Sequence, residues 1–227
     1  MPTAIKILSG NAMRTFLREI VPLFERANGA KVEVEYRLTS VLKKEIEEGY
    51  AFDLALLPRA EIDELTAAGK IAEGATADVT RSAVGFCVRA GAPKPDIGTV
   101  AAFKAALLAA KSISYSDGPS GAYVAGLLEK LGLAAAMKDK TRLTSRPVAE
   151  LVAAGEAEIG LQQIVAILPV KGADLVGPLP AELQNVIIYA AGLSAGAREP
   201  KAARAFVAFA KTPLAARLIR EKGMEPA

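Results

Sequence analysis

The chain has 227 residues, with 28 Lys and Arg against 25 Asp and Glu, which gives a net charge of +3. Hydrophobic residues make up 52% and charged residues 23%, a composition typical of a folded protein with a core and unlike that of a disordered chain. No apolar run reaches the roughly 18–20 residues that a membrane-spanning helix needs, and no Lys/Arg cluster marks a stripe that would bind nucleic acid.

Histidine is absent, and cysteine occurs once, as Cys87. Histidine-based acid–base catalysis, Ser–His and Cys–His nucleophiles and histidine-ligated metals are therefore excluded. Cys87 stands in an apolar, strand-like run, so we expect a buried and unreactive thiol. We expect neither a metal nor a cofactor.

The first ten residues lack the apolar segment that follows the charged start of a signal peptide. We therefore expect a periplasmic protein if a signal peptide has been removed, and a cytoplasmic protein otherwise.

Strand-like and helix-like segments alternate along the first ninety residues. The clearest helix covers residues 12–28, where apolar residues recur at the i, i+3, i+4, i+7 spacing of one helix face and Gly29 supplies a left-handed cap. The expected strands cover residues 4–8, 31–36 and 52–57, and the expected helices cover residues 12–28, 41–48 and 60–68.

The same alternation continues to the end of the chain. Its repeated strand–helix order with short connections predicts an α/β fold with mostly parallel sheets flanked by helices. Gly/Pro-rich breaks near residue 90 and over residues 172–180 favour two α/β lobes over one long sheet. The expected strands are 82–88, 112–115, a short one at Leu143, 158–161 and 186–193, and the expected helices are 99–110, 121–131, 148–154, 201–211 and 213–221.

Three strand-to-helix turns carry small hydroxyl, amide or glycine residues. The first N–H groups of a helix have no partner inside it, and the helix dipole leaves that end partly positive. Such a turn either caps its helix through a Ser or Thr side chain or holds an oxyanion, and for one turn alone capping is the simpler role. Three of them at strand ends point to a ligand, because ligands of open parallel sheets bind there. The turns are Ser9-Gly10-Asn11, Thr39-Ser40 and Ser116–Gly121.

Arginines near these strand ends supply positive charge, and guanidinium groups bind carboxylates bidentately. We expect two of them to act in a site: Arg14, which follows Asn11 by about one turn, and Arg81, which heads the strand that opens the second half. The full set is Arg14, Arg37, Arg59, Arg81 and Arg146.

Two further polar positions stand next to apolar strands. Asp53 opens a buried strand, and bracing a neighbouring loop is a simpler role for it than catalysis. Gln162 and Gln163 follow the strand over residues 158–161, and an amide that faces a cleft and a satisfied turn residue are equally compatible with this position.

Six segments carry a resemblance that covers essentially the whole chain: Ile5–Asn11, Thr39-Ser40 ahead of Glu45–Gly49, Asp53–Pro58, Ala67–Ile71, Pro119–Tyr123 and Lys222–Pro226. In this order and spacing they resemble the bacterial molybdate-binding proteins, which are type 2 periplasmic solute-binding proteins. The resemblance implies two lobes joined by crossover hinge strands, with an anion buried in the cleft between them. Lobe one would comprise residues 1–82 plus 191–227, and lobe two residues 83–190.

The chain departs from the molybdate pattern at two positions. Molybdate binders offer a serine where this chain has Asn11, and a tyrosine where it has Gln163. Thr39 and Ser40 keep the hydroxyls of the second turn. The family has a second branch, which aconitate isomerase resembles; it shares the fold and acts on tricarboxylates. A carboxylate ligand therefore fits this chain better than molybdate.

The sequence therefore predicts a monomeric solute-binding protein of an ABC-type transporter, with a small anionic ligand, membrane transporter subunits as possible partners and no nucleic acid. The ligand would be an organic di- or tricarboxylate. Two alternatives stay open: a molybdate or sulfate binder, and a cofactor-independent isomerase of a tricarboxylate such as aconitate. The predicted ligand-binding residues are Ser9, Gly10, Asn11, Arg14, Thr39, Ser40, Arg81, Ser120, Gly121, Ser145 and Gln163.

An isomerase would also need an acid–base group near the substrate. Asp117 is our candidate, because desolvation in a closed cleft can bring the pKa of a carboxylate toward neutrality. Stabilising its own turn is the simpler role for this residue. The other residues considered are Tyr123, Tyr115, Lys6, Ser9 and Ser120.

Overall fold

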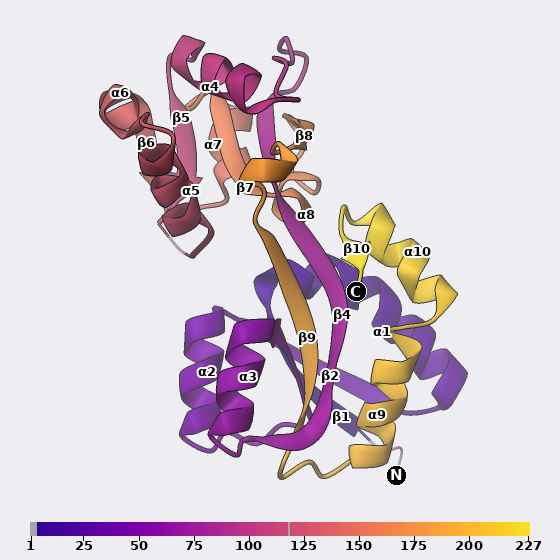
Figure 1. Cartoon of the computed structure of the whole chain (residues 1–227). Coiled ribbons are helices and arrows are strands. Elements are labelled where there is room, and N and C mark those ends of the chain that lie inside the picture. Colours follow the sequence, from indigo (N-terminus) through magenta and orange to yellow (C-terminus); the bar gives the residue numbers. More distant parts are fainter. Residues whose placement is uncertain (1–3, 118) are drawn as a thin grey trace. The chain divides into compact units, whose positions relative to one another are not determined.

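The computed structural model describes residues 4–117 and 119–227, and the chain divides into two compact units. Unit 1 comprises residues 1–81 and 187–227, and unit 2 comprises residues 82–186. Two strands pass from one unit to the other, β4 (Ile71–Arg89) and β9 (Val186–Ser194) (Figure 1). The expected boundaries, after residues 82 and 190, differ from the observed ones, after residues 81 and 186, by one and four residues.

Unit 1 is a sheet flanked by helices, built from both ends of the chain. Its other elements are β1 (Ala4–Gly10), η1 (Asn11–Met13), α1 (Arg14–Asn28), β2 (Lys31–Arg37), α2 (Thr39–Glu47), β3 (Leu54–Pro58), α3 (Arg59–Ala67), α9 (Pro200–Phe209), α10 (Pro213–Glu221) and β10 (Glu225–Pro226). β1 pairs in parallel with β2 and with β3, β3 pairs antiparallel with β9, and β10 pairs antiparallel with β4.

Helices cover both faces of the unit 1 sheet (Figure 1). On one face, the buried residues of α2 and α3 pack with Leu8 of β1 and Leu57 of β3. On the other face, Phe24 of α1 packs edge-on against Phe206 of α9, with ring centroids 5.1 Å apart. The helical face predicted for residues 12–28 is confirmed, because its central residues Phe16, Leu17, Ile20 and Phe24 are all buried.

Unit 2 repeats the architecture. Its elements besides β4 are α4 (Val100–Ala109), β5 (Ile113–Ser116), α5 (Pro119–Lys130), α6 (Ala134–Met137), η2 (Lys138–Lys140), β6 (Thr141–Thr144), α7 (Val148–Ala154), β7 (Ile159–Gln163), α8 (Ile164–Ile167), β8 (Ala173–Pro178) and η3 (Ala181–Leu183). β5 pairs in parallel with β6 and β7, and β4 pairs antiparallel with β7 and β8. The predicted α/β class is confirmed, but the expectation of mostly parallel sheets is not: each unit combines parallel pairs with antiparallel pairs, the latter formed by the late strands β9 and β10 and by β4.

The strand β4 serves two cores in unit 2, because successive side chains of a strand point to opposite faces. Val84, Phe86 and Val88 join the cluster beneath α4, α5 and α6, and Cys87 joins the cluster beneath α7 and α8. Burial raises the pKa of the Cys87 thiol to about 12, so it stays protonated and unreactive. The expectation of an inert, buried cysteine is confirmed.

Three features differ from the sequence-based expectation. β4 begins at Ile71 and not at residue 82, because its first part is half exposed and carries no apolar run. The break expected over residues 172–180 contains β8, and a short α8 follows β7 directly. Arg81 therefore does not head a strand: it lies inside β4, opposite Glu225 of β10.

The carboxylate of Asp53 joins both ends of the chain in unit 1. It is 4% exposed and accepts three backbone hydrogen bonds, from the N–H of Lys6 at 2.8 Å, of Arg198 at 2.7 Å and of Glu199 at 2.9 Å. Glu199 immediately precedes α9, so Asp53 also satisfies donors at the start of that helix. Its predicted bracing role is confirmed.

In the part of the chain that the structure describes, no helix combines the length and the apolar character needed to cross a membrane.

Candidate functional site

The ends of β1 and β2 bring two of the predicted turns together. The two strands are in parallel register, with Ser9 opposite Tyr36 and Gly10 opposite Arg37. A Cβ atom on Gly10 would lie 3.2 Å from the Oγ1 atom of Thr39, so the turns after the two strands touch. Ser9 is fully buried, and its hydroxyl donates to the carbonyl oxygen of Gly10.

The second turn does not cap its helix. Thr39 and Ser40 are the first two residues of α2, and the N-cap position is Leu38, whose side chain cannot accept a hydrogen bond. By contrast, Thr99 and Thr212 cap α4 and α10 by accepting the backbone N–H of Ala102 and Ala215. The capping role considered for Thr39 and Ser40 is therefore wrong, and among the described residues neither hydroxyl has a hydrogen-bond partner.

Arg14 is held at the same edge by two neutral partners. Its Nη2 donates to Oδ1 of Asn11 at 2.8 Å, and its guanidinium lies over the ring of Tyr36, 4.5 Å from the centroid. Burial raises the pKa of Tyr36, so the phenol stays neutral and offers its π face to the cation. Neither partner cancels the charge of Arg14.

The other arginines near strand ends are neutralised. Arg37 pairs with Glu35 at 2.7 Å, Arg59 with Asp63 and Asp78 at 2.8 Å each, and Arg146 with Glu156 at 2.7 Å. Across residues 4–117 and 119–227, by contrast, neither Arg14 nor the exposed Arg81 forms an ion pair. The two arginines expected to act in a site are thus the two of the five that form no ion pair within the described residues, although Arg81 has Glu225 opposite it on β10.

Lys6 belongs to a separate cluster on β1 and β2. Its Nζ lies 2.8 Å from Glu35 and donates to the hydroxyl of Tyr50 at 3.0 Å. The hydrogen bond with Glu35 raises the pKa of Lys6 and lowers that of Glu35, so both groups stay charged at neutral pH. This lysine is therefore unsuited to act as a base.

Unit 2 gathers its predicted residues at the ends of β5, β6 and β7. The hydroxyls of Ser116 and Ser120 lie 3.1 Å apart, and the N–H of Asp117 donates to the carbonyl oxygen of Thr144 at 3.1 Å. The side chain of Asp117 is exposed. Gly118, which belongs to the predicted turn, lies outside the described residues.

The two glutamines, expected to follow the strand, are the last two residues of β7, and they have different roles. Gln162 accepts the N–H of Ala149 through Oε1 at 3.2 Å, which satisfies the start of α7, so it is a structural residue. Gln163 is 7% exposed and has a bonding partner. Ser145 is exposed, between Thr144 and Arg146, which are joined by a 2.9 Å hydrogen bond from the N–H of Arg146 to Oγ1 of Thr144.

Each unit thus assembles its own half of the predicted set. Unit 1 brings together Ser9, Gly10, Asn11, Arg14, Thr39 and Ser40, and unit 2 brings together Ser120, Gly121, Ser145 and Gln163. Arg81 lies apart, on β4. The sequence reasoning missed Tyr36 and Leu38. From the sequence, Tyr36 was interpreted only as part of an alternating strand. A leucine at an N-cap position gives no signal in a search for polar residues, so Leu38 was missed too.

The sequence-family model of the bacterial extracellular solute-binding proteins matches residues 5–225 of this chain. The chain belongs to this family. An aconitate isomerase from a Pseudomonas species is 31% identical over 231 residues, which cover 99% of this chain and 88% of that protein. The predicted family resemblance is confirmed.

Solved structures agree on the fold. The substrate-binding domain assigned to a molybdenum ABC transporter of Clostridium difficile superposes with a TM-score of 0.84, at 17% identity and 99% coverage of both chains. The periplasmic molybdate-binding protein of Azotobacter vinelandii gives a TM-score of 0.77, at 17% identity, with 97% of this chain and 98% of that one covered. The predicted two-lobed fold is confirmed.

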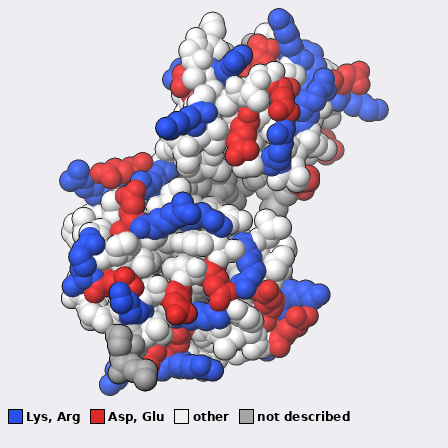
Figure 2. Space-filling view, turned by 180° about the vertical axis from the view of Figure 1, so that it is seen from behind, with Lys and Arg blue, Asp and Glu red and all other residues white. Residues whose placement is uncertain are grey.

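Within the described residues, no three His, Cys, Asp or Glu side chains lie close enough together to hold a metal ion. Figure 2 shows basic and acidic side chains interspersed over the face that it displays, without a broad field of either sign there.

The Ser116–Gly121 turn allows a matched test in one helix. A methyl group on Gly121 would overlap the backbone carbonyl of Ser116, whereas one on Gly126 would meet nothing within 4 Å. We expect Gly121→Ala to cost about 1–3 kcal/mol, because the turn must shift, and Gly126→Ala to stabilise the helix by about 0.5–1 kcal/mol.

Thermal unfolding of the two variants measures both effects. The expected result is a melting temperature below wild type for Gly121→Ala and slightly above it for Gly126→Ala. If Gly121→Ala unfolds at the wild-type temperature, the close approach of α5 to Ser116 is wrong.

Proposed function

We propose that this chain binds a small organic di- or tricarboxylate between its two units, as the periplasmic solute receptor of an ABC-type transporter. The units would close over the ligand by bending β4 and β9. We propose that the receptor is a monomer, and that transporter subunits are its protein partners.

The observation that carries this proposal is that neither Arg14 nor Arg81 forms an ion pair within the described residues. An arginine near a ligand site that already pairs with a carboxylate has little to offer a ligand carboxylate. Arg14 has only Asn11 and the ring of Tyr36 as partners, and these fix the position of its guanidinium without neutralising it. A guanidinium fork held in place in this way is suited to bidentate carboxylate binding.

The first turn of α2 would supply the second group of donors. Thr39 and Ser40 contribute two hydroxyls and the N–H groups that no side-chain cap occupies. In unit 2, Ser120, Gly121, Ser145 and Gln163 would contact the other end of the ligand. A ligand with two or three carboxylates could engage the donors of both units at once, which a single carboxylate could not.

The relatives bear on the choice of ligand. The relative at 31% identity carries the name of an enzyme that acts on a tricarboxylate, and the structures with molybdenum or molybdate in their titles share only 17%. Asn11 and Gln163 also replace residues that molybdate binders use. We therefore favour a carboxylate over molybdate or sulfate.

A thermal-shift screen of citrate, cis- and trans-aconitate, malate, molybdate and sulfate tests the proposal. A ligand at about 100 times its dissociation constant adds about 2.7 kcal/mol to the free energy of unfolding. For a chain of this size that raises the melting temperature by about 5–11 °C. Strong stabilisation by molybdate or sulfate, with none by a carboxylate, would refute the carboxylate ligand.

Substitution of Arg14 or Arg81 gives a sharper test of the proposed ligand contacts. In a closed, water-poor cleft, removing either guanidinium leaves a ligand carboxylate unpaired and costs about 2–5 kcal/mol of binding free energy. Arg14→Ala and Arg81→Ala should each weaken binding about 30-fold or more in calorimetry. Arg59→Ala is the matched control, because Arg59 is already paired with Asp63 and Asp78. Unchanged affinity in the Arg14 and Arg81 variants would make them solvated surface residues.

The identity with an aconitate isomerase favours a second candidate function, a cofactor-independent tricarboxylate isomerase. An aconitate-type isomerisation takes a proton from one carbon and returns it to another, which moves the double bond and needs one acid–base group. Lys6 is committed to Glu35, and the hydroxyl of Tyr123 donates to the carbonyl of Leu183 at 2.8 Å. Asp117, with an exposed carboxylate on the turn after β5, stays our candidate for this group.

Incubation with cis- and trans-aconitate, followed by ultraviolet absorbance and by proton exchange in heavy water, tests this function. If the protein is an isomerase, Asp117→Asn should lower the rate at least 100-fold, since general acid–base groups contribute about 10²–10⁴. Asp139→Asn, an exposed carboxylate on η2, serves as the control. Activity that survives Asp117→Asn refutes the role of Asp117, and tight binding without any turnover leaves a receptor.

A further inference from the structure

Unit 2 contains a pocket at the opposite edge of its sheet from the predicted ligand residues. The pocket has a volume of about 480 Å³, within the usual range for small-molecule sites. It opens where β5 and β7 begin, beside Ser112 and Glu158. Gln163 is the last residue of β7 and Ser120 follows the end of β5, so this pocket is distinct from the site proposed above.

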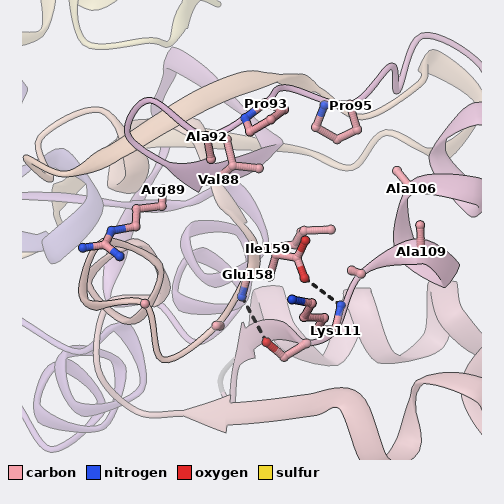
Figure 3. A pocket seen from close by; sticks show the side chains of 14 residues that line it. Val88, Arg89, Ala92, Pro93, Pro95, Ala106, Ala109, Lys111, Glu158 and Ile159 are labelled. Atoms are coloured by element: carbon pink, nitrogen blue, oxygen red, sulfur yellow. Dashed lines mark hydrogen bonds between the residues drawn. The ribbon is translucent and has the colours of Figure 1, made fainter.

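The walls of the pocket are apolar and formed by small side chains. Pro93 and Pro95, from the segment after β4, lie along one side, and Ala106 and Ala109 of α4 project from another (Figure 3). Val88 and Ile159, both nearly fully buried, close the space between them. Small residues on four segments leave a hollow that an apolar chain can fill.

The polar groups of the pocket carry an excess of positive charge. Arg89 lies at one end and Lys111 at the bottom in Figure 3, and in the part of the chain that the structure describes neither forms an ion pair. Glu158 is the acidic residue of the lining, and its Oε2 already accepts the backbone N–H of Lys111 at 2.7 Å. Two uncompensated cations against one carboxylate leave a net charge of +1.

We propose that this pocket binds a monocarboxylate with a short aliphatic chain. The chain would lie against Val88, Ile159 and the alanines of α4, and the carboxylate would pair with Lys111 or Arg89. An aliphatic amine is disfavoured, because it would meet two cations and a single carboxylate that is already hydrogen-bonded. This proposal does not depend on the ligand proposed for the other site.

Titration of the ¹⁵N-labelled protein with butanoate, hexanoate and hexylammonium tests it. Hexanoate should bind saturably, with the largest shifts at the amides of Lys111, Gly155 and Ile159. Its affinity should exceed that of butanoate, by up to about fourfold for each added methylene. Hexylammonium, with the same chain and the opposite charge, should bind at least fivefold more weakly.

Two pairs of variants place the ligand. Ala109→Phe fills the pocket and should abolish hexanoate binding, whereas Ala105→Phe, one turn earlier on α4 and outside the lining, should leave it unchanged. Lys111→Gln with Arg89→Gln should weaken hexanoate at least fivefold, and Lys130→Gln on α5 should not. The ligand of the other site should neither compete with hexanoate nor lose affinity in these variants.

Several results would overturn the proposal. Equal binding of hexanoate and hexylammonium would contradict the charge complementarity. Wild-type affinity in Ala109→Phe, or competition between hexanoate and a tricarboxylate, would place hexanoate elsewhere. The absence of saturable shifts at Lys111, Gly155 and Ile159 would show that the pocket does not bind this class of ligand.

Discussion

Unit 1 depends on one buried carboxylate. Asp53 accepts the N–H groups of Lys6, Arg198 and Glu199, residues that the chain separates by nearly its whole length. A buried charge without partners would be strongly unfavourable, so these three donors and the carboxylate require one another. The first eighty residues can bury Asp53 only if the C-terminal segment returns to the same sheet, where Ser194 of β9 also donates its N–H to the carbonyl of Asp53. Together with the pairing of β3 with β9 and the contact of Phe24 with Phe206, this interaction joins the two separate pieces of sequence into one unit.

Because unit 1 is built from both the first and the last part of the chain, unit 2 is inserted between them. The chain must leave unit 1 once and return once, and it does so through β4 and β9. β4 pairs with β10 of unit 1 and with β7 and β8 of unit 2, so bending of this strand falls on the residues between these paired segments. The hydrogen bonds of Asp53 join the segments of unit 1, and the two cores on either side of β4 join those of unit 2. Motion in the proposed receptor would therefore concentrate in the two connecting strands, which is how hinge closure works in two-lobed binding proteins.

Most helices and strands could be predicted from the sequence, because residue periodicity and Gly or Pro boundaries are local signals. The stripe of α1 and the apolar run of β3 are read directly. The first part of β4 was missed because residues 72–78 face solvent in part, and their pairing is fixed by tertiary contacts. The site was predicted in part. Arg14 and Thr39 were found from their positions at strand ends. The contact of the Arg14 guanidinium with the ring of Tyr36 could not be predicted, because it depends on the register of β1 and β2, which no local sequence pattern encodes.

The distribution of charge separates residues that build this protein from those that are free to bind. Lys6, Arg37, Arg59 and Arg146 each meet a carboxylate of the chain, and such pairs at half-exposed sites contribute little beyond local order. Arg14 instead rests on an aromatic face and an amide, partners that restrict its motion without consuming its charge. Leu38 occupies the N-cap of α2 without a side-chain hydrogen bond, and its carbonyl accepts the N–H of Val41 and Leu42, so Thr39 and Ser40 carry the backbone N–H groups that precede these bonds. In both places donor groups stay without an acidic partner, and a ligand carboxylate is a group that would pair with them.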